Sequence, residues 1–260
     1  MSDPIVFQNT RLRGDVNLKG SFITGSLKNK VFEATWLCPA DGISDDAASI
    51  NDIISICDCI HFKKGIYRLK SNFSPPLDDN ELSDPYLRTH IGINRNGIKL
   101  FGDEGAELVS DIACVTICVY SPRFQIENSI RNIEIAGLTF SIRNDGNIFH
   151  EYSHVIRVIG VNGLKIKKCV FNDFWGDAIS LSHYGDDPNT GERTRNENVS
   201  ITNNQILGGI HHNNRNGISV INGKNVLIKD NIIKNTSRND MPGGIDIEPN
   251  NSAYTIENKI

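Results

Sequence analysis

Two carboxylates near the end of the chain are the residues best placed for chemistry. The stretch "PGGIDIEPNN" holds Asp246 and Glu248 two positions apart among isoleucines. If this stretch is a strand, alternate side chains point to opposite faces, so both carboxylates share one face, about 6.5 Å apart along the backbone. Cleavage of a glycosidic bond usually needs two carboxyl groups about 5 to 9.5 Å apart. We therefore predict that they act as the acid and the base or nucleophile. The alternative is the solvated face of an ordinary strand.

Further polar and aromatic residues occur in the two preceding stretches, "NDFWGDAISLSHYGDD" and "GGIHHNNRNGISV". Asp177 is a third catalytic candidate. Aromatic rings can stack on the apolar C–H faces of sugars, although Trp175 could instead pack in the core. Adjacent histidines on a strand face opposite ways and cannot both bind one metal, so we predict no metal site and no cofactor. The predicted substrate-binding residues are Trp175, His183, Tyr184, His211, His212 and Arg215.

The elements that must position these residues belong to a repeat. Five stretches align, with successive steps of 31, 35, 27 and 28 residues: "IEIAGLTF" from Ile133, "LKIKKCVF" from Leu164, "VSITNNQI" from Val199, "VLIKDNII" from Val226 and "YTIENKI" from Tyr254. Stacked short strands of period two, separated by Gly and Asn turns and lacking helical periodicity, indicate an all-β parallel solenoid. An antiparallel sandwich is the alternative, but the register repeats at one rung length and hairpin dipeptides are few.

A second strand follows in three units, as "DAISL", "NGISV" and "GGIDI". Superposing them predicts three columns of side chains, two apolar and one outward. Coils stack about 4.8 Å apart, so the outward column would form a shallow track for a glycan along the solenoid. A further column at the bend, Asn204 and Asn231, predicts a short amide ladder that Cys169 interrupts. The three columns are Ile179, Ile218 and Ile245; Leu181, Val220 and Ile247; and, outward, Ser180, Ser219 and Asp246.

The front of the chain resembles a known superfamily. "ADGISDDAASINDII", followed by "IHFKKGIYRL" and "GIKLFGDEGAEL", is similar to the first segment of the pectate-lyase-like right-handed β-helix proteins, including phage tailspikes and capsule depolymerases. Asp41, Gly42, Asp45 and Asp46 match the D-G-x-x-D-D signature. The resemblance implies a right-handed parallel β-helix whose first coil is closed by a short helix. Asp45 or Asp46 can cap that helix, and its apolar stripe is Ile50, Ile53 and Ile54.

The totals exclude several classes of partner. With 27 basic against 31 acidic residues the net charge is −4, which offers no footprint for nucleic acid or anionic lipid. No apolar run suits a signal peptide or a membrane span, so we expect synthesis in a host cytoplasm. The six cysteines form no C-x-x-C pair and are expected to be reduced.

Domain boundaries and assembly follow from the same pattern. Residues 1 to 31 form a polar lead, expected to be a neck or adaptor, and residues 32 to 260 form the β-helix. The last repeat stops partway through a coil, so we expect a chain truncated at its C-terminal end or covered there by a partner. The resemblance implies a homotrimer in the virion, as part of a phage tail.

The resemblance and the paired carboxylates together predict a tailspike-like depolymerase that hydrolyses a bacterial capsular or lipopolysaccharide glycan. A lyase is the alternative enzyme, with calcium held by Asp177, Asp186 and Asp187 and with Arg215 as the base. "GDAISL" resembles the acidic turn of polygalacturonases, but Ala178 replaces its second Asp and the "RIK" motif is missing. These departures favour a third possibility, a β-helix that binds glycan or serves a structural role without catalysis.

Overall fold

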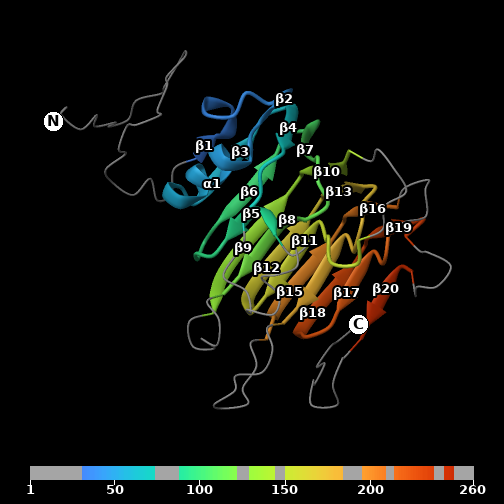
Figure 1. The fold of residues 1–260 in the computed structure, drawn as a ribbon. Helices are drawn as coiled ribbons and strands as arrows, with labels where there is room; N and C mark the ends of the chain where they lie inside the picture. The colour runs from blue at the N-terminus through green and yellow to red at the C-terminus, as the bar shows by residue number, and fades with distance from the viewer. Residues whose placement is uncertain are drawn as a thin grey trace.

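The computed structural model describes residues 31–73, 88–121, 129–143, 150–183, 195–208, 214–236 and 243–248. Of the predicted lead, only Val31 lies within these ranges. The last predicted repeat, from Tyr254, lies outside them. Figure 1 shows the described part as a stack of short strands that runs from β1 near the N-terminal end to β20.

The strands form three sheets, and every strand pair within them is parallel. Sheet A contains β1 (Val31–Glu33), β3 (Cys59–Phe62), β6 (Lys99–Gly102), β9 (Ile130–Ala136), β12 (Val161–Lys167), β15 (Glu197–Thr202) and β18 (Lys224–Lys229). Sheet B contains β2 (Asp41–Asp45), β4 (Gly65–Leu69), β7 (Ala106–Ser110), β10 (Thr139–Ile142), β13 (Val170–Asn172), β16 (Gln205–Leu207) and β19 (Ile232–Lys234). Sheet C contains β5 (Thr89–Ile93), β8 (Val115–Tyr120), β11 (Ile156–Ile159), β14 (Ile179–Ser182), β17 (Ile218–Val220) and β20 (Ile245–Ile247).

From β3 onward the chain visits sheets A, B and C in turn, one strand in each per coil, whereas the first coil has β1 and β2 followed by helix α1 (Ala47–Ile56) instead of a sheet C strand. Parallel strands joined in this way wind into a right-handed parallel β-helix. The predicted fold is therefore confirmed. The sequence pattern predicted the coils because alternate side chains of each strand point into one continuous core. These inward positions are therefore apolar, and the alternation is visible in the sequence.

The predicted columns are confirmed by the strand register. Ser180 pairs with Ser219, and Ser219 with Asp246, while the two apolar columns align beside them. At the bend between sheets A and B, Asn204 Nδ2 donates to Asn231 Oδ1 at 2.9 Å. Cys169 interrupts the amide ladder as predicted, although its backbone N–H donates to Asn204 Oδ1 at 2.9 Å.

Helix α1 (Ala47–Ile56) lies at the N-terminal end of the stack, preceded by a short 3-10 helix, Ala34–Trp36 (Figure 1). Its apolar stripe, Ile50, Ile53 and Ile54, is buried in the core of the β-helix, as predicted. Asp45 makes the capping contact, because its Oδ1 accepts the Ala47 N–H at 3.2 Å. Asp46 makes no such contact with the helix.

All six cysteines lie in the described ranges and are free thiols, as expected. Five of them are buried, where they pack as small apolar groups. Among the described residues, no helix is long and apolar enough to cross a membrane.

Candidate functional site

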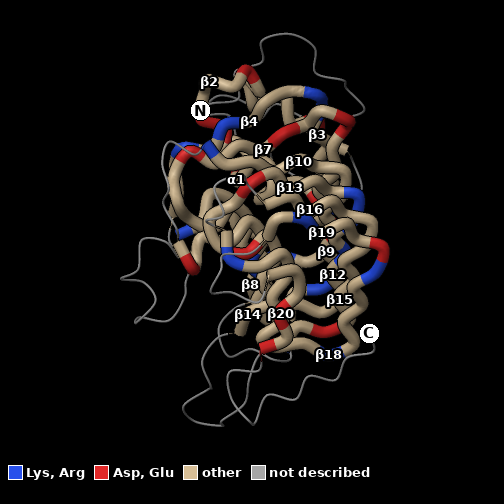
Figure 2. Tube along the Cα trace, turned by 90° about the vertical axis from the view of Figure 1, so that its right-hand side faces the viewer, with Lys and Arg blue, Asp and Glu red and all other residues tan. Residues whose placement is uncertain are grey.

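The candidate site lies on the outer face of sheet C, over its last three strands β14, β17 and β20. The inward residues of β14 and β17, such as Ile179 and Val220, belong to the core, so their neighbours Ser180 and Ser219 face outward. The outward column continues from Arg157 of β11 through these serines to Asp246 of β20. Figure 2 marks acidic positions at and beside β20.

A ladder of side chains marks the start of these strands. The backbone N–H of Asp177 donates to His154 Nδ1 at 3.1 Å, and that of Asn216 donates to Asp177 Oδ1 at 3.0 Å. The N–H of Gly243 donates in turn to Asn216 Oδ1 at 3.1 Å. Each side chain therefore accepts a hydrogen bond from the next coil. Sequence reasoning missed this ladder, although Asp177, Asn216 and Gly243 begin the three strands that it aligned.

Arg215 connects the ladder to the carboxylates at the surface. Its Nη1 lies 3.4 Å from Asp177 Oδ2, its Nη2 3.1 Å from Glu248 Oε2 and its Nε 3.8 Å from Glu151 Oε1. The Arg215 side chain is only 11 % exposed, whereas those of Glu151 and Glu248 are each 42 % exposed. Burial lowers the pKa of Arg215, but the charges of Asp177, Glu151, Glu248 and Asp246 outweigh it and raise that pKa above its ordinary value. Arg215 is therefore a fixed cation.

Asp177 lies behind Arg215 and has no exposed surface. Burial raises the pKa of Asp177 to about 7, although the charge of Arg215 and hydrogen bonds from Ser219 and Asn216 act in the opposite direction. A side chain without exposed surface cannot touch a substrate in this arrangement. From this buried position Asp177 contacts the Arg215 guanidinium and accepts the Asn216 backbone N–H.

His154 completes the buried end of the cluster. Burial, and then the charges of Arg157 and Arg215, hold the pKa of His154 well below its usual range, so the ring is neutral. Its Nδ1 accepts the Asp177 N–H, which assigns the ring proton to Nε2. The same Nδ1 lies 3.3 Å from Asp177 Oδ2. His154 Nδ1 and an ionised Asp177 Oδ2 would both be acceptors and would repel each other at this distance. They can lie this close when the Asp177 carboxyl carries a proton, which agrees with its raised pKa.

Asp246 is the middle residue of β20, and Glu248 directly follows this strand, where its backbone N–H donates to the Val220 carbonyl at 3.1 Å. Asp246 is half-buried, and its Oδ2 accepts a hydrogen bond from Asn216 Nδ2 at 3.2 Å. Glu248 is held instead by Arg215. The two carboxylates therefore have different partners, one a neutral amide and the other a cation.

Other predicted residues are placed less favourably for direct contact with a sugar. Trp175 is 5 % exposed, so its ring presents no free face for stacking. This burial agrees with the alternative, in which Trp175 packs in the interior. His183 is half-buried just after β14. Tyr184, His211 and His212 lie outside the described residues, as do Asp186 and Asp187.

The open track along the outward column is a correction. Ser180 and Ser219 are each 0 % exposed, and Arg157 is 6 % exposed, so a glycan cannot rest on this column as far as Asp246. The alternation along a strand predicts the face to which a side chain points. It does not predict whether other segments cover that face. The partly exposed acidic groups of the site are Glu151, Asp246 and Glu248. Glu151 escaped sequence reasoning because it lies in an irregular turn before β11, outside every repeat.

The lyase alternative requires Arg215 to act as the base. Arg215 would have to release a proton, but its pKa is raised and three carboxylates surround it. Within the described part of the chain, no group of three or more His, Cys, Asp or Glu side chains could hold a metal ion.

Comparisons with known proteins give similar folds but no relative from which an activity can be inferred. No family model and no curated protein matches the chain. One similar solved structure is a candidate glycosyl hydrolase from Parabacteroides merdae, with 14 % identity and a TM-score of 0.42, covering 88 % of this chain and 100 % of that one. Another is the A-module of the mannuronan C-5 epimerase AlgE4 from Azotobacter vinelandii, with 16 % identity and a TM-score of 0.42, covering 78 % of this chain and 58 % of that one. Similarity at this level carries no argument about activity.

Proposed function

We propose that the chain is a polysaccharide-degrading glycoside hydrolase whose reacting groups are Asp246 and Glu248. One observation carries the proposal. Two carboxylates lie two residues apart at the end of β20, partly exposed, and each is held by a separate buried partner, Asn216 or Arg215. A strand gains no evident stability from two acidic residues at adjacent same-face positions, so this arrangement favours a functional role.

The different partners suggest a division of labour. A carboxylate whose charge is balanced by a guanidinium suits the base or nucleophile, so we assign this role to Glu248. Asp246, which accepts a hydrogen bond from a neutral amide, is then the group that protonates the leaving oxygen. Arg215 and Asp177 act through these two as positioning residues.

The substrate class is a bacterial capsular or lipopolysaccharide glycan, and the chain is a tailspike-type depolymerase that works as a homotrimer in a phage tail. The support is the D-G-x-x-D-D signature, Asp41 to Asp46, together with the buried helix that closes the first coil. In that signature Asp41 Oδ1 accepts the backbone N–H groups of Ile43 and Ser44, and Asp45 accepts those of Lys70 and Ser71.

The test is release of reducing ends from a panel of bacterial surface polysaccharides. Asp246→Asn and Glu248→Gln remove the acid–base chemistry with little change of shape, so each should lower the rate by about 100-fold or more. Asp230→Asn, an exposed acidic residue on the last described coil, is the matched control and should be fully active. Full activity in both site variants would remove the assignment.

Two other outcomes would replace the proposal. Products with a new carbon–carbon double bond, seen by their ultraviolet absorbance, would make the chain a lyase. Tight glycan binding without any product would make it a binding module.

A further inference from the structure

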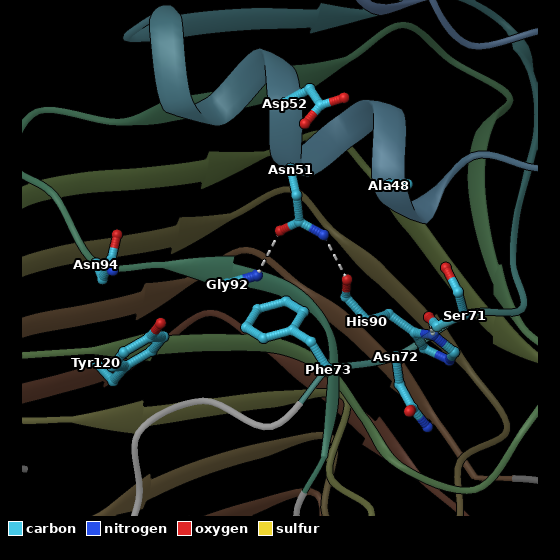
Figure 3. A pocket seen from close by; sticks show the side chains of 10 residues that line it. All are labelled: Ala48, Asn51, Asp52, Ser71, Asn72, Phe73, His90, Gly92, Asn94 and Tyr120. Atoms are coloured by element: carbon cyan, nitrogen blue, oxygen red, sulfur yellow. Dashed lines mark hydrogen bonds between the residues drawn. The ribbon is translucent and has the colours of Figure 1, made fainter.

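A concave site lies at the other end of sheet C from the carboxylates, beside helix α1. It is a pocket of about 460 Å³, within the range of about 300 to 1,000 Å³ that small-molecule sites occupy. The lining combines two aromatic rings with small polar side chains (Figure 3). The described residues that line it are Ala48, Asn51, Asp52, Ser71, Asn72, Phe73, His90, Gly92, Asn94 and Tyr120.

Four contacts hold the walls of this pocket in place. Asn51 joins the helix to edge strand β5, because its Nδ2 donates to the His90 carbonyl at 2.7 Å and its Oδ1 accepts the Gly92 N–H at 3.0 Å. His90 Nδ1 donates to the Ser71 carbonyl at 2.6 Å. Phe73 forms an antiparallel bridge with Thr89. The segment that carries Phe73 is therefore fixed against β5.

Gly92 provides the space in which the Phe73 ring lies. A Cβ atom at Gly92 would stand 2.5 Å from Phe73 Cζ and 3.4 Å from Tyr120 Cε1. Figure 3 shows the Phe73 ring next to Gly92, with Tyr120 on the far side of the pocket from Ser71. Phe73 is 36 % exposed, so part of its apolar surface remains open to a ligand.

The chemistry of the lining limits the occupant. A sugar ring has apolar C–H faces and hydroxyl groups at its rim, which match an open aromatic ring surrounded by amides, two hydroxyl groups and a carboxylate. Among the ten lining residues there is one carboxylate, on the exposed Asp52, and no lysine or arginine. The Asp52 carboxylate would repel an anionic sugar, and the lining has no basic side chain to offset that repulsion. A neutral sugar would not be repelled.

We infer that this pocket is a separate binding site for a neutral sugar residue of the glycan. The choice of a sugar rests on the proposed function, whereas the pocket itself does not. Gly92 belongs to the same outward column as Asp246, five strands away in sheet C. At about 4.8 Å per strand, the two sites lie about 24 Å apart on one face. The site therefore retains polysaccharide near the carboxylates without taking part in cleavage.

The binding test uses methyl glycosides of glucose, galactose, mannose and N-acetylglucosamine, titrated into the full chain and followed by the amide NMR signals of Gly92 and Asn94. At least one glycoside should shift both signals. Phe73→Ala removes the stacking ring and should weaken binding about tenfold. Gly92→Ala should weaken it similarly, because the added methyl group displaces the ring. Ile43→Ala, which truncates an apolar side chain that is 71 % exposed and outside the pocket, should leave binding unchanged.

Absence of shifts with every glycoside, or equal affinity in the wild type, Phe73→Ala and Gly92→Ala, would overturn the inference. Asp52→Ala changes an exposed residue of helix α1 and should therefore stay folded even if the other two variants unfold. It should also bind the glycoside more weakly, because it removes the one carboxylate of the lining. Glu248→Gln separates the two proposals, because it should lose cleavage and keep the Gly92 shifts. NMR shifts without any cleavage would support the sugar-binding pocket and contradict the proposed hydrolase activity. Cleavage without shifts would support the hydrolase activity and contradict the sugar-binding pocket.

Discussion

Arg215 sets the charge balance of the candidate site, because one guanidinium contacts Asp177, Glu151 and Glu248. Two of these carboxylates are exposed and one has no exposed surface, so the contacts differ in energy. A pair at the surface contributes at most about 1 kcal/mol, whereas loss of one partner from a buried pair costs about 3 to 5 kcal/mol. We therefore expect stability to depend on the contact with Asp177 and activity to depend on the contact with Glu248.

At a pH above the raised pKa of Asp177, where its carboxyl is ionised, Arg215→Gln should destabilise the protein by about 3 kcal/mol, because it leaves this buried charge without its cation. Adding Asp177→Asn should recover most of that loss, because the double variant contains no uncompensated charge. Urea denaturation of the wild type, both single variants and the double variant measures the coupling. A double variant that is as unstable as the sum of the single changes would show that the two side chains do not interact.

The pH dependence of stability follows from the raised pKa of Asp177. The folded state keeps a proton up to about pH 7, whereas the unfolded chain releases it near 3.8, so this group lowers stability as pH rises between those values. The depressed pKa of His154 acts in the opposite direction, because its contribution is complete above 6.5 and is lost as pH falls.

Comparison with Asp177→Asn isolates the first of these effects. The difference in unfolding free energy, wild type minus variant, should fall as pH rises from about 4 to about 7 and then become constant. Urea titrations at several pH values measure it. A difference that does not change with pH would mean that Asp177 titrates normally.

At the scale of elements, the sequence predicted coils and columns because each depends on a local rule. Period-two alternation placed Ile179, Ile218 and Ile245 in one apolar column, and the repeated bend placed Asn204 beside Asn231. The site was harder, because its contacts join residues that belong to no repeat. Glu151 lies in an irregular turn, and the burial of Ser180 depends on what covers the sheet rather than on the strand itself.

The amide ladder should stabilise the stack of coils. Asn204 is 1 % exposed and bonds to Asn231, to the Ile166 carbonyl and to the Cys169 N–H. Asn204→Ala leaves these buried groups without partners, so it should destabilise the protein by about 2 to 3 kcal/mol. Asn162→Ala, which removes a bond to Asn198 at the exposed surface, should change stability by less than about 1 kcal/mol. Chemical denaturation compares the two, and equal losses would contradict a special role for the buried ladder.

At the scale of the whole molecule, apolar side chains are exposed on the last described coil. Leu227 of β18, Ile232 of β19 and Ile245 and Ile247 of β20 are between 41 % and 49 % exposed. On β20, which is the last described strand of sheet C, the two isoleucines continue the core columns. In a solenoid, side chains of this kind belong to the surface on which successive coils stack.

The proposed homotrimer can be tested on the same chain. Light scattering coupled to size exclusion should give three times the mass of one chain at micromolar concentration. A mass of one chain that persists as concentration rises would contradict the trimer, while leaving the carboxylate site untouched.

The central claim, hydrolysis by Asp246 and Glu248, is tested most directly by mass spectrometry of glycan products formed in H₂¹⁸O. Hydrolysis places one oxygen from water at each new reducing end, whereas elimination by a lyase places none. We predict ¹⁸O-labelled products from the wild type and from Asp230→Asn, and loss of these products in Asp246→Asn and Glu248→Gln. Unlabelled unsaturated products, or labelled products that persist unchanged in both site variants, would contradict the claim.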